Sequence, residues 1–227
     1  MATGVADRLR AVQAEMATSC AKAGRPADDV RLIAVSKGRG PDAIRAAYAA
    51  GQRHFGENYA AELAGKQREL ADLAIVWHFI GRVQRGNAKL IVHADLIHGV
   101  SSISQAEALL KVASGQLPVL LQVNLADEDS KGGFSSTSLA AALPQLRALR
   151  GLALTGLMAM PHVDDVRPAF AAVRALRDQL VPDLRDLSMG MSGDFGIAIE
   201  EGATLVRVGT SIFGPRPALQ SRQQGAP

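Results

Sequence analysis

Lys37 ends an apolar run, Arg31-Leu-Ile-Ala-Val-Ser-Lys37, whose composition is that of a buried strand. Side chains alternate between the two faces of a strand, so Lys37 should point the same way as Ile33 and Val35, into a core or a pocket. Burial disfavours the charged form of a lysine amine, and an uncharged amine can attack an aldehyde to form an imine. Taken alone, the segment favours an ordinary strand-end lysine that reaches solvent, so the case for a reactive lysine depends on the rest of the chain.

Two turns near the end of the sequence have the composition of phosphate-binding loops. Residues 188–194 read Ser-Met-Gly-Met-Ser-Gly-Asp, and residues 207–214 read Arg-Val-Gly-Thr-Ser-Ile-Phe-Gly. Small and hydroxyl residues before a helix leave backbone N–H groups available to an anion. In either turn alone, Ser192 could simply cap a helix and Gly209 could simply break a strand. Because both turns follow adjacent predicted strands, they favour a phosphate site that includes Ser192, Gly209 and Thr210.

Arg207 shares a strand face with Gly209, so its guanidinium should point inward. A buried arginine needs an acceptor, because leaving it unpaired is costly. A ligand's ring nitrogen or carboxylate could serve. A structural ion pair with Glu57 or Asp194 is the alternative.

Strand-like and helix-like segments alternate after an N-terminal helix predicted at 4–23. The predicted strands are 31–36, 53–56, 76–80, 95–100, 118–124, 152–157, 184–188 and 204–208. The predicted helices lie near 41–50, 58–71, 84–92, 103–113, 136–148, 164–180, 194–201 and 211–214. This alternation predicts an α/β fold, a single (β/α)8 TIM-type barrel over residues 1–216, with residues 217–227 as a disordered tail.

A doubly wound open sheet is the alternative fold. Its dinucleotide-binding form would carry Gly-x-Gly-x-x-Gly after the first strand, whereas this chain has Ser36-Lys-Gly-Arg-Gly-Pro41. In (β/α)8 barrels the active site lies at the C-terminal ends of the strands, and phosphate often binds after strands seven and eight. The barrel would therefore bring Lys37 and both anion turns to one end.

Composition narrows the class of protein. The 227 residues carry a formal charge of +3, with Lys and Arg scattered among the acidic residues, so nucleic-acid binding is not favoured. The single cysteine, Cys20, allows no internal disulfide and suits the cytoplasm. We expect no membrane span and, because the five histidines lack ligand spacing, no metal site. His78 is expected to be a satisfied core histidine rather than a pocket residue.

Several motifs together resemble the pyridoxal phosphate homeostasis protein family, also known as YggS-like or proline synthase co-transcribed proteins. The matching segments, which span about residues 4–216, are Leu32-Ile-Ala-Val-Ser-Lys37, His54-Phe-Gly-Glu-Asn58, Trp77-His-Phe-Ile-Gly81, Gln122-Val-Asn124, Gly156-Leu-Met158, Leu187-Ser-Met-Gly-Met-Ser192 and Val206-Arg-Val-Gly-Thr-Ser-Ile-Phe-Gly214. The resemblance implies a barrel similar to the N-terminal domain of alanine racemase, with pyridoxal 5′-phosphate (PLP) as the cofactor.

By this resemblance, Lys37 holds PLP as a reversible Schiff base and Asn58 lies beside the cofactor ring. Arg207 would face the pyridine nitrogen, and Ser192, Gly209 and Thr210 would bind the phosphate. The turn Gly38-Arg39-Gly40 departs from the Thr-Lys-Pro-like turn more usual in the family. Lys131 resembles another family lysine, but we expect it to be a solvated loop residue.

The implied function is intracellular PLP, or vitamin B6, homeostasis by a cytoplasmic protein that buffers or delivers PLP. Its partners would be PLP and, transiently, apo forms of PLP-dependent enzymes, and the chain would be a monomer. A PLP-dependent amino-acid racemase or related enzyme is the alternative. Racemisation needs a proton donor or acceptor on each face of the cofactor. The only tyrosines, Tyr48 and Tyr59, lie on predicted helical segments. An interaction module that uses the basic surface is a third possibility.

Overall fold

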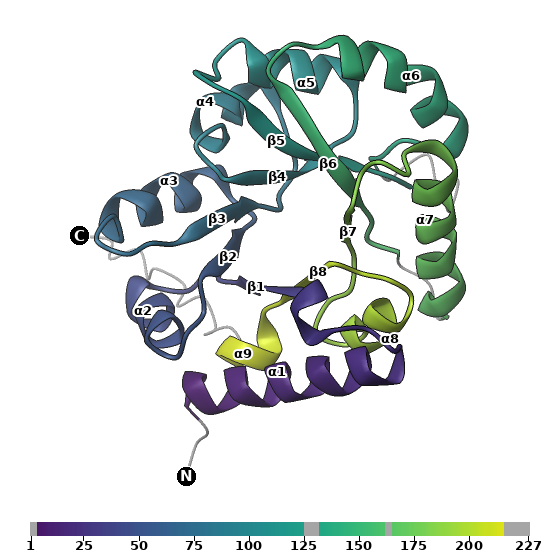
Figure 1. Cartoon of the computed structure of the whole chain (residues 1–227). Helices are drawn as coiled ribbons and strands as arrows, with labels where there is room; N and C mark the ends of the chain where they lie inside the picture. The colour runs from purple at the N-terminus through teal and green to yellow at the C-terminus, as the bar shows by residue number, and fades with distance from the viewer. Residues whose placement is uncertain (1–3, 125–131, 162–164, 216–227) are drawn as a thin grey trace, which may run out of the picture.

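The structure, a computed structural model, describes residues 4–124, 132–161 and 165–215. Its strands are β1 (Arg31–Val35), β2 (His54–Glu57), β3 (Val76–Phe79), β4 (Leu96–Val100), β5 (Leu117–Gln122), β6 (Leu152–Met158), β7 (Asp186–Ser188) and β8 (Leu205–Val208). All eight are parallel and close into a barrel, in which β1 pairs with both β2 and β8 (Figure 1). The closed sheet confirms the (β/α)8 prediction and excludes the open sheet, whose edge strands would stay unpaired.

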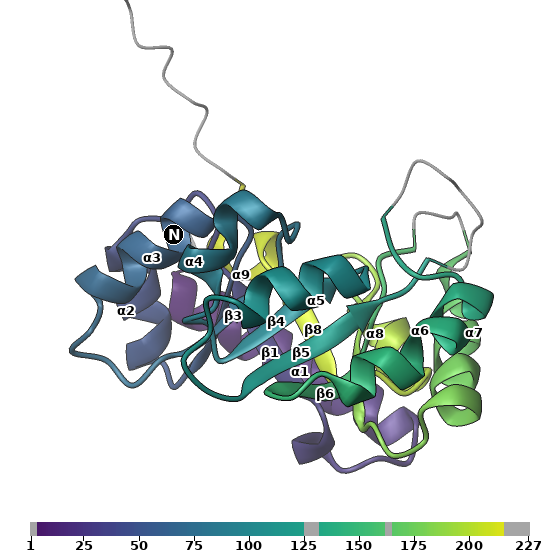
Figure 2. The same ribbon diagram turned by 90° about the horizontal axis from the view of Figure 1, so that it is seen from above.

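Helices follow the strands and surround the barrel. They are α1 (Val5–Lys22), α2 (Pro41–Ala49), α3 (Ala60–Glu69), α4 (Ala88–Ile91), α5 (Ile103–Leu110), α6 (Ser136–Ala148), α7 (Val166–Leu180), α8 (Phe195–Glu200) and α9 (Thr210–Phe213), with 3-10 turns η1 (Ala27–Asp29) and η2 (Arg85–Asn87). Figure 2 shows α2, α3 and α4 on one flank of the barrel and α6 and α7 on the other.

Most predicted element bounds agree with the structure to within a few residues. The exception is the helix predicted near 84–92, which is divided into the 3-10 turn η2 and the single turn of α4. Gly86 lies inside η2, and glycine is a poor helix former because its backbone loses the most freedom on ordering.

The apolar core has two layers, as expected for a barrel of this size. A small cluster fills the barrel interior and consists of Ile33, Leu96, Leu120, Met158 and Leu205. A much larger cluster lies between the barrel and the helices and includes Phe55, Phe79, Phe170 and Phe195, all with 2% or less exposure. Inward and outward residues alternate along each strand, so the side chains of one strand supply both layers.

Helix α1 packs against α8 and α9, the two helices that follow the predicted phosphate turns (Figure 1). Two arginines fasten this contact. Arg8 Nε donates to the Ile212 carbonyl at 2.7 Å, and Arg25, just after α1, donates to the Ile199 carbonyl at 2.8 Å. The first helix of the chain therefore supports the last two.

Two of the expectations from sequence fall on residues that the structure does not describe. The predicted tail, residues 217–227, and Lys131 lie outside the described residues. Within the described ranges, no helix has the length and apolar character needed to cross a membrane.

Candidate functional site

A cavity of about 300 Å³ opens at the C-terminal ends of the strands. It is lined by all six residues singled out from the sequence, Lys37, Asn58, Ser192, Arg207, Gly209 and Thr210. Apolar side chains complete the wall, namely Val35, Ile80, Met160 and Met191. A volume of this size suits a small cofactor or substrate. The barrel thus brings together, from positions 37 to 210, the groups that the sequence pattern predicted would meet.

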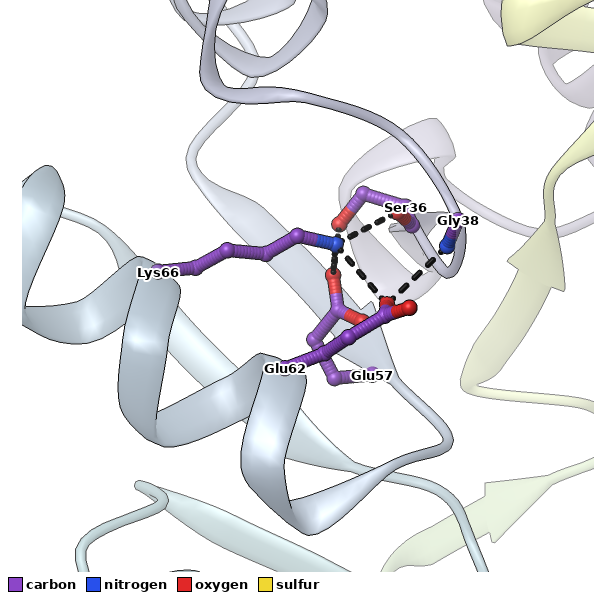
Figure 3. Close-up of polar contacts among 5 residues, drawn as sticks. All are labelled: Ser36, Gly38, Glu57, Glu62 and Lys66. Carbon is purple, nitrogen blue, oxygen red and sulfur yellow. Dashed lines mark hydrogen bonds and ion pairs between the residues drawn. The ribbon is translucent and has the colours of Figure 1, made fainter. Parts of the chain in front are cut away.

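Lys37 lies in the turn after β1, and side chains from β2 and α3 hold this turn on both sides. Lys66 Nζ donates to the Ser36 carbonyl at 2.8 Å, and the Gly38 N–H donates to Glu62 Oε2 at 2.9 Å (Figure 3). Gly38 adopts φ +69°, a left-handed conformation that glycine tolerates best. The backbone immediately before and after Lys37 is therefore fixed.

We call Ser36, Gly38, Glu57, Glu62 and Lys66 the Lys66 cluster. Lys66 is only 7% exposed, and its ammonium also contacts Glu57 Oε1 at 2.6 Å and Glu62 Oε2 at 3.1 Å. Ser36 Oγ donates to the same Glu57 oxygen at 2.6 Å, whereas Glu57 Oε2 is buried and has no hydrogen-bond partner among the described residues. Burial raises the pKa of Glu57 to about 7, although Lys66 and Ser36 act to lower that pKa.

The two predicted phosphate turns are joined to each other. The Gly209 N–H donates to Ser192 Oγ at 3.3 Å, so the Ser192 hydroxyl can still donate its own hydrogen to a ligand. Ser192 is therefore not the helix cap; Asp194 holds the N-cap position of α8. Gly190 has φ +91°, and a Cβ there would lie 2.6 Å from that of Ala198, so the turn requires glycine.

Arg207 points into the barrel, as predicted, and is 4% exposed. Its partner in register is Ile33, an inward residue of β1. The guanidinium donates to Ser188 Oγ at 2.6 Å and to the Ala159 carbonyl at 3.0 Å. These neutral acceptors replace the ion pair with Glu57 or Asp194 that was considered from the sequence. Burial lowers the pKa of Arg207 to about 10, so the group stays charged at neutral pH.

A row of histidines continues inward from Arg207. Ser188 Oγ lies 2.8 Å from His98 Nδ1, His98 Nε2 lies 3.0 Å from His78 Nδ1, and His78 Nε2 lies 3.0 Å from His54 Nδ1. We call Arg207, Ser188, His98, His78 and His54 the histidine chain. His78 is 1% exposed and does not line the cavity, in agreement with the expectation of a satisfied core histidine.

Asn58 bears directly on whether a cofactor fits. Its Oδ1 is buried without a hydrogen-bond partner among the described residues, and the residue lines the cavity beside Lys37. A buried acceptor of this kind needs a donor. PLP would offer its aldehyde to Lys37, its ring hydroxyl to Asn58, its pyridine nitrogen to Arg207 and its phosphate to the joined turns. The residues present fit this cofactor.

The Lys66 cluster and the partners of His78 were not identified from the sequence, although signals for them exist. Lys66 stands between Leu63 and Leu70 on the buried stripe of α3, where a leucine would be the usual residue. His54, His78 and His98 fall on three successive strands, one in each strand–helix unit. Each signal depends on contacts between residues that are far apart in the sequence. It therefore becomes informative only after the strands have been assigned.

The structure provides few other groups for acid–base or metal chemistry near the cavity. Among the described residues, no group of three or more His, Cys, Asp and Glu side chains could hold a metal ion. Tyr48 accepts from the Ala74 N–H and stacks on Arg53, and Tyr59 is 58% exposed before α3; neither lines the cavity.

Comparison with known proteins agrees with this geometry. The family model of the alanine racemase N-terminal domain matches residues 8–217. The pyridoxal phosphate homeostasis protein of Pseudomonas aeruginosa is 43% identical over 220 residues, which cover 93% of this chain and 96% of the relative. The structure of PipY from Synechococcus elongatus with PLP bound has a TM-score of 0.80 and 40% identity, covering 92% of this chain and all of PipY.

Alanine racemase from E. faecalis shares the fold alone. It has a TM-score of 0.65 with 18% identity, and the match covers 90% of this chain but 58% of the racemase. The remaining part of the racemase chain has no counterpart in the match. The family model and the near full-length similarity to curated relatives show that this chain belongs to the pyridoxal phosphate homeostasis protein family, within the alanine racemase N-terminal domain family.

Proposed function

We propose that this protein binds PLP reversibly through Lys37 and takes part in intracellular PLP homeostasis by buffering or delivering the cofactor. The amine of Lys37 forms a C=N bond with the aldehyde carbon and releases one water; hydrolysis reverses the step and frees PLP. The observation that carries the proposal is the convergence of an amine, an unpartnered amide oxygen, a buried arginine and two joined anion turns on one cavity. The PLP-bound PipY structure supports the same cofactor.

Each residue has a defined part in this proposal. Lys37 forms the covalent bond, Asn58 lies beside the ring, and Arg207 donates to the pyridine nitrogen. Ser192, Gly209 and Thr210 bind the phosphate with hydroxyl and backbone N–H groups. A cationic donor at the ring nitrogen keeps that nitrogen unprotonated, which weakens the electron withdrawal that amino-acid chemistry on PLP requires.

A racemase is not favoured by the cavity wall. Among the described residues that line it, Lys37 and Arg207 are the only ionisable side chains, so no second acid–base group faces Lys37. We therefore propose a binding protein without strong turnover. We also propose that it acts in the cytoplasm as a monomer and meets apoenzymes transiently, without nucleic acid or membrane as a partner.

Covalent binding can be tested by absorbance and reductive trapping. Wild-type protein mixed with PLP should show an imine band, and borohydride should fix the adduct on Lys37, as located by peptide mass spectrometry. Lys37→Ala should lose the adduct, whereas Lys89→Ala, which removes an exposed lysine, should retain it. Equal trapping in wild type and Lys37→Ala would refute the assignment.

The phosphate site can be tested separately by comparing PLP with pyridoxal, which lacks the phosphate. Thr210→Val should weaken PLP binding about 10-fold, the equivalent of one hydrogen bond to a charged group, and leave pyridoxal binding unchanged. An equal loss for both ligands would contradict a role in phosphate binding.

Delivery requires a transfer experiment. Holo protein should reactivate an apo PLP-dependent enzyme faster than an equal concentration of free PLP. Reactivation at the same rate as free PLP would rule out delivery and leave buffering.

A further inference from the structure

The histidine chain runs through the barrel interior, from His54 toward the cavity at the C-terminal ends of the strands. His54 pairs in register with Val76, and His78 lies two residues further along β3. His78 pairs with Leu96, and His98 again lies two residues further along β4. Because the strands are parallel, each step moves one inward position closer to the C-terminal ends, where the cavity lies. His54 is half-buried near the opposite end, whereas His98 is 0% exposed.

The hydrogens of this chain can be placed by donor and acceptor capacity. A guanidinium has five N–H donors and no acceptor, so Ser188 Oγ must accept from Arg207. Within the described ranges, Ser188 Oγ has only one other partner, His98 Nδ1 at 2.8 Å, and Ser188 is 0% exposed, so its hydroxyl hydrogen finds an acceptor only by donating there. A neutral imidazole has one donor and one acceptor nitrogen. His98 therefore donates through Nε2 to His78 Nδ1, and His78 donates through Nε2 to His54 Nδ1.

Charged histidines do not fit this arrangement. An imidazolium donates from both nitrogens, so a proton on His78 or His98 would turn an accepted hydrogen bond into two opposed donors. Burial also lowers the pKa of His78 to about 3, and the pKa of His98 well below its ordinary value, with neighbouring cationic groups adding to both shifts. Arg31 and Asp95 are the charged groups that act on His54.

We propose that Arg207 fixes the direction in which hydrogen bonds are donated along the histidine chain, so that His98, His78 and His54 are all neutral Nε2–H tautomers. The chain in turn positions the Arg207 guanidinium. Ser188 and the Ala159 carbonyl take two N–H donors, which leaves others for a ligand in the cavity. The tautomers follow from the protein alone, while the use of Arg207 toward a pyridine nitrogen rests on the proposed function. Ser188 and the histidines are positioning residues.

The tautomers can be observed in cofactor-free protein. A His93→Asn/His162→Asn variant leaves only the three histidines of the chain. Long-range 1H–15N correlation of this protein, labelled with 15N-histidine at neutral pH, should show three Nε2–H patterns. An Nδ1–H pattern or a charged ring at His78 or His98 would overturn the proposal. Because no PLP is present, this result stands or falls independently of binding at Lys37.

The positioning role needs a second measurement. Ser188→Ala removes the hydroxyl that His98 accepts from, so His98 should become a mixture of tautomers, and PLP binding should weaken about 10-fold, the equivalent of one charge-assisted hydrogen bond. Ser19→Ala, which alters a buried serine of α1 outside the chain, should change neither quantity. An unchanged His98 tautomer together with unchanged PLP affinity in Ser188→Ala would overturn the positioning role. If wild type itself does not bind PLP, the proposed function fails while the tautomer result is unaffected.

Discussion

Two buried networks flank the cavity and fix its two cationic residues by different means. The Lys66 cluster lies between the barrel and α3 and holds the turn of Lys37 through charged groups (Figure 3). The histidine chain lies inside the barrel and holds Arg207 through neutral groups. One network fixes a backbone, and the other fixes a side chain.

The difference follows from what each cationic residue must do. In the proposed function Lys37 forms and breaks a bond, so its side chain must move while its backbone stays in place. Arg207 only donates hydrogen bonds, so its side chain can be held rigidly. A charged cluster is sensitive to the loss of any member, because each charge depends on its partners. A chain of neutral groups is less costly to bury, but each group must donate its hydrogen bond in the same direction along the chain.

The largest effect should come from Lys66→Met, which keeps most of the side-chain volume and removes the charge. Glu57 and Glu62 lose their ammonium partner, and a buried pair broken in this way costs about 3–5 kcal/mol. Urea unfolding should show a loss of this size. Arg68→Met, which removes a charge from the exposed side of the same helix, should change stability by no more than about 0.5 kcal/mol. A loss below about 1 kcal/mol for Lys66→Met would contradict a structural role for the cluster.

His78→Phe should have the next largest effect. Phenylalanine fills similar space but leaves His54 Nδ1 and His98 Nε2 without the ring between them. Two lost hydrogen bonds with buried groups left unpaired should cost about 2–3 kcal/mol in the same urea assay. His93→Asn, at an exposed histidine, serves as the control and should be close to neutral. If His78→Phe were as stable as wild type, the chain would contribute little to folding.

The two networks should also respond to pH with opposite signs. The pKa of His54 falls to about 4 and that of His78 to about 3 through burial, so between these values and 6.5 the unfolded state binds more protons. Stability then falls as pH falls below 6.5, by up to about 1.4 kcal/mol per pH unit for His78 and by less for half-buried His54, whose charge solvent partly screens. The pKa of Glu57 is raised from 4.5 to about 7, so between these values the folded state binds more protons than the unfolded state. The free energy of unfolding therefore falls as pH rises through this interval.

Glu57→Gln separates these contributions. Between pH 4.5 and 6.5 the stability of this variant should rise with pH more steeply than wild type, by up to about 1.4 kcal/mol per unit. Urea unfolding at several pH values gives both slopes. An equal or shallower slope in Glu57→Gln would show that Glu57 of the folded protein is ionised throughout this range.

Gly38→Ala should produce the smallest change. The left-handed backbone at φ +69° costs a residue with a Cβ about 1 kcal/mol. Gly65→Ala is the matched control with the opposite expected sign, because Gly65 lies inside α3 with open space where the added methyl group would stand, and should stabilise the protein by about 0.5–1 kcal/mol. Unchanged or increased stability in Gly38→Ala would show that the turn has no special requirement for glycine.

The barrel could be predicted from sequence because its signals are local and repeated. Alternating strands and helices set the element order, and the strand period placed Lys37 and Arg207 inward. Cavity residues could be predicted because (β/α)8 barrels use one end of the strands for binding. Resemblance to a family then assigned each residue a role.

The two networks could not be predicted because their partners depend on three-dimensional register. Nothing local indicates that Lys66 reaches the carbonyl of Ser36, 30 residues earlier in the chain. The contact between His98 and Ser188 spans 90 residues and depends on the stagger of the barrel strands. Arg207 illustrates the limit well: its inward direction was predicted, but its acceptors in the protein, Ser188 Oγ and the Ala159 carbonyl, were not.

The pairing of β1 with β8 places Arg207, near one end of the chain, beside the strand that leads to Lys37, near the other. During synthesis a ribosome would release the lysine long before the arginine, so an incomplete nascent chain has Lys37 without the two turns at residues 188–194 and 207–214. Contacts of such long sequence separation also slow folding. In the proposed function, cofactor capture would therefore begin only after translation has passed the last strand, and a truncated product would carry the lysine without the turns that retain the cofactor.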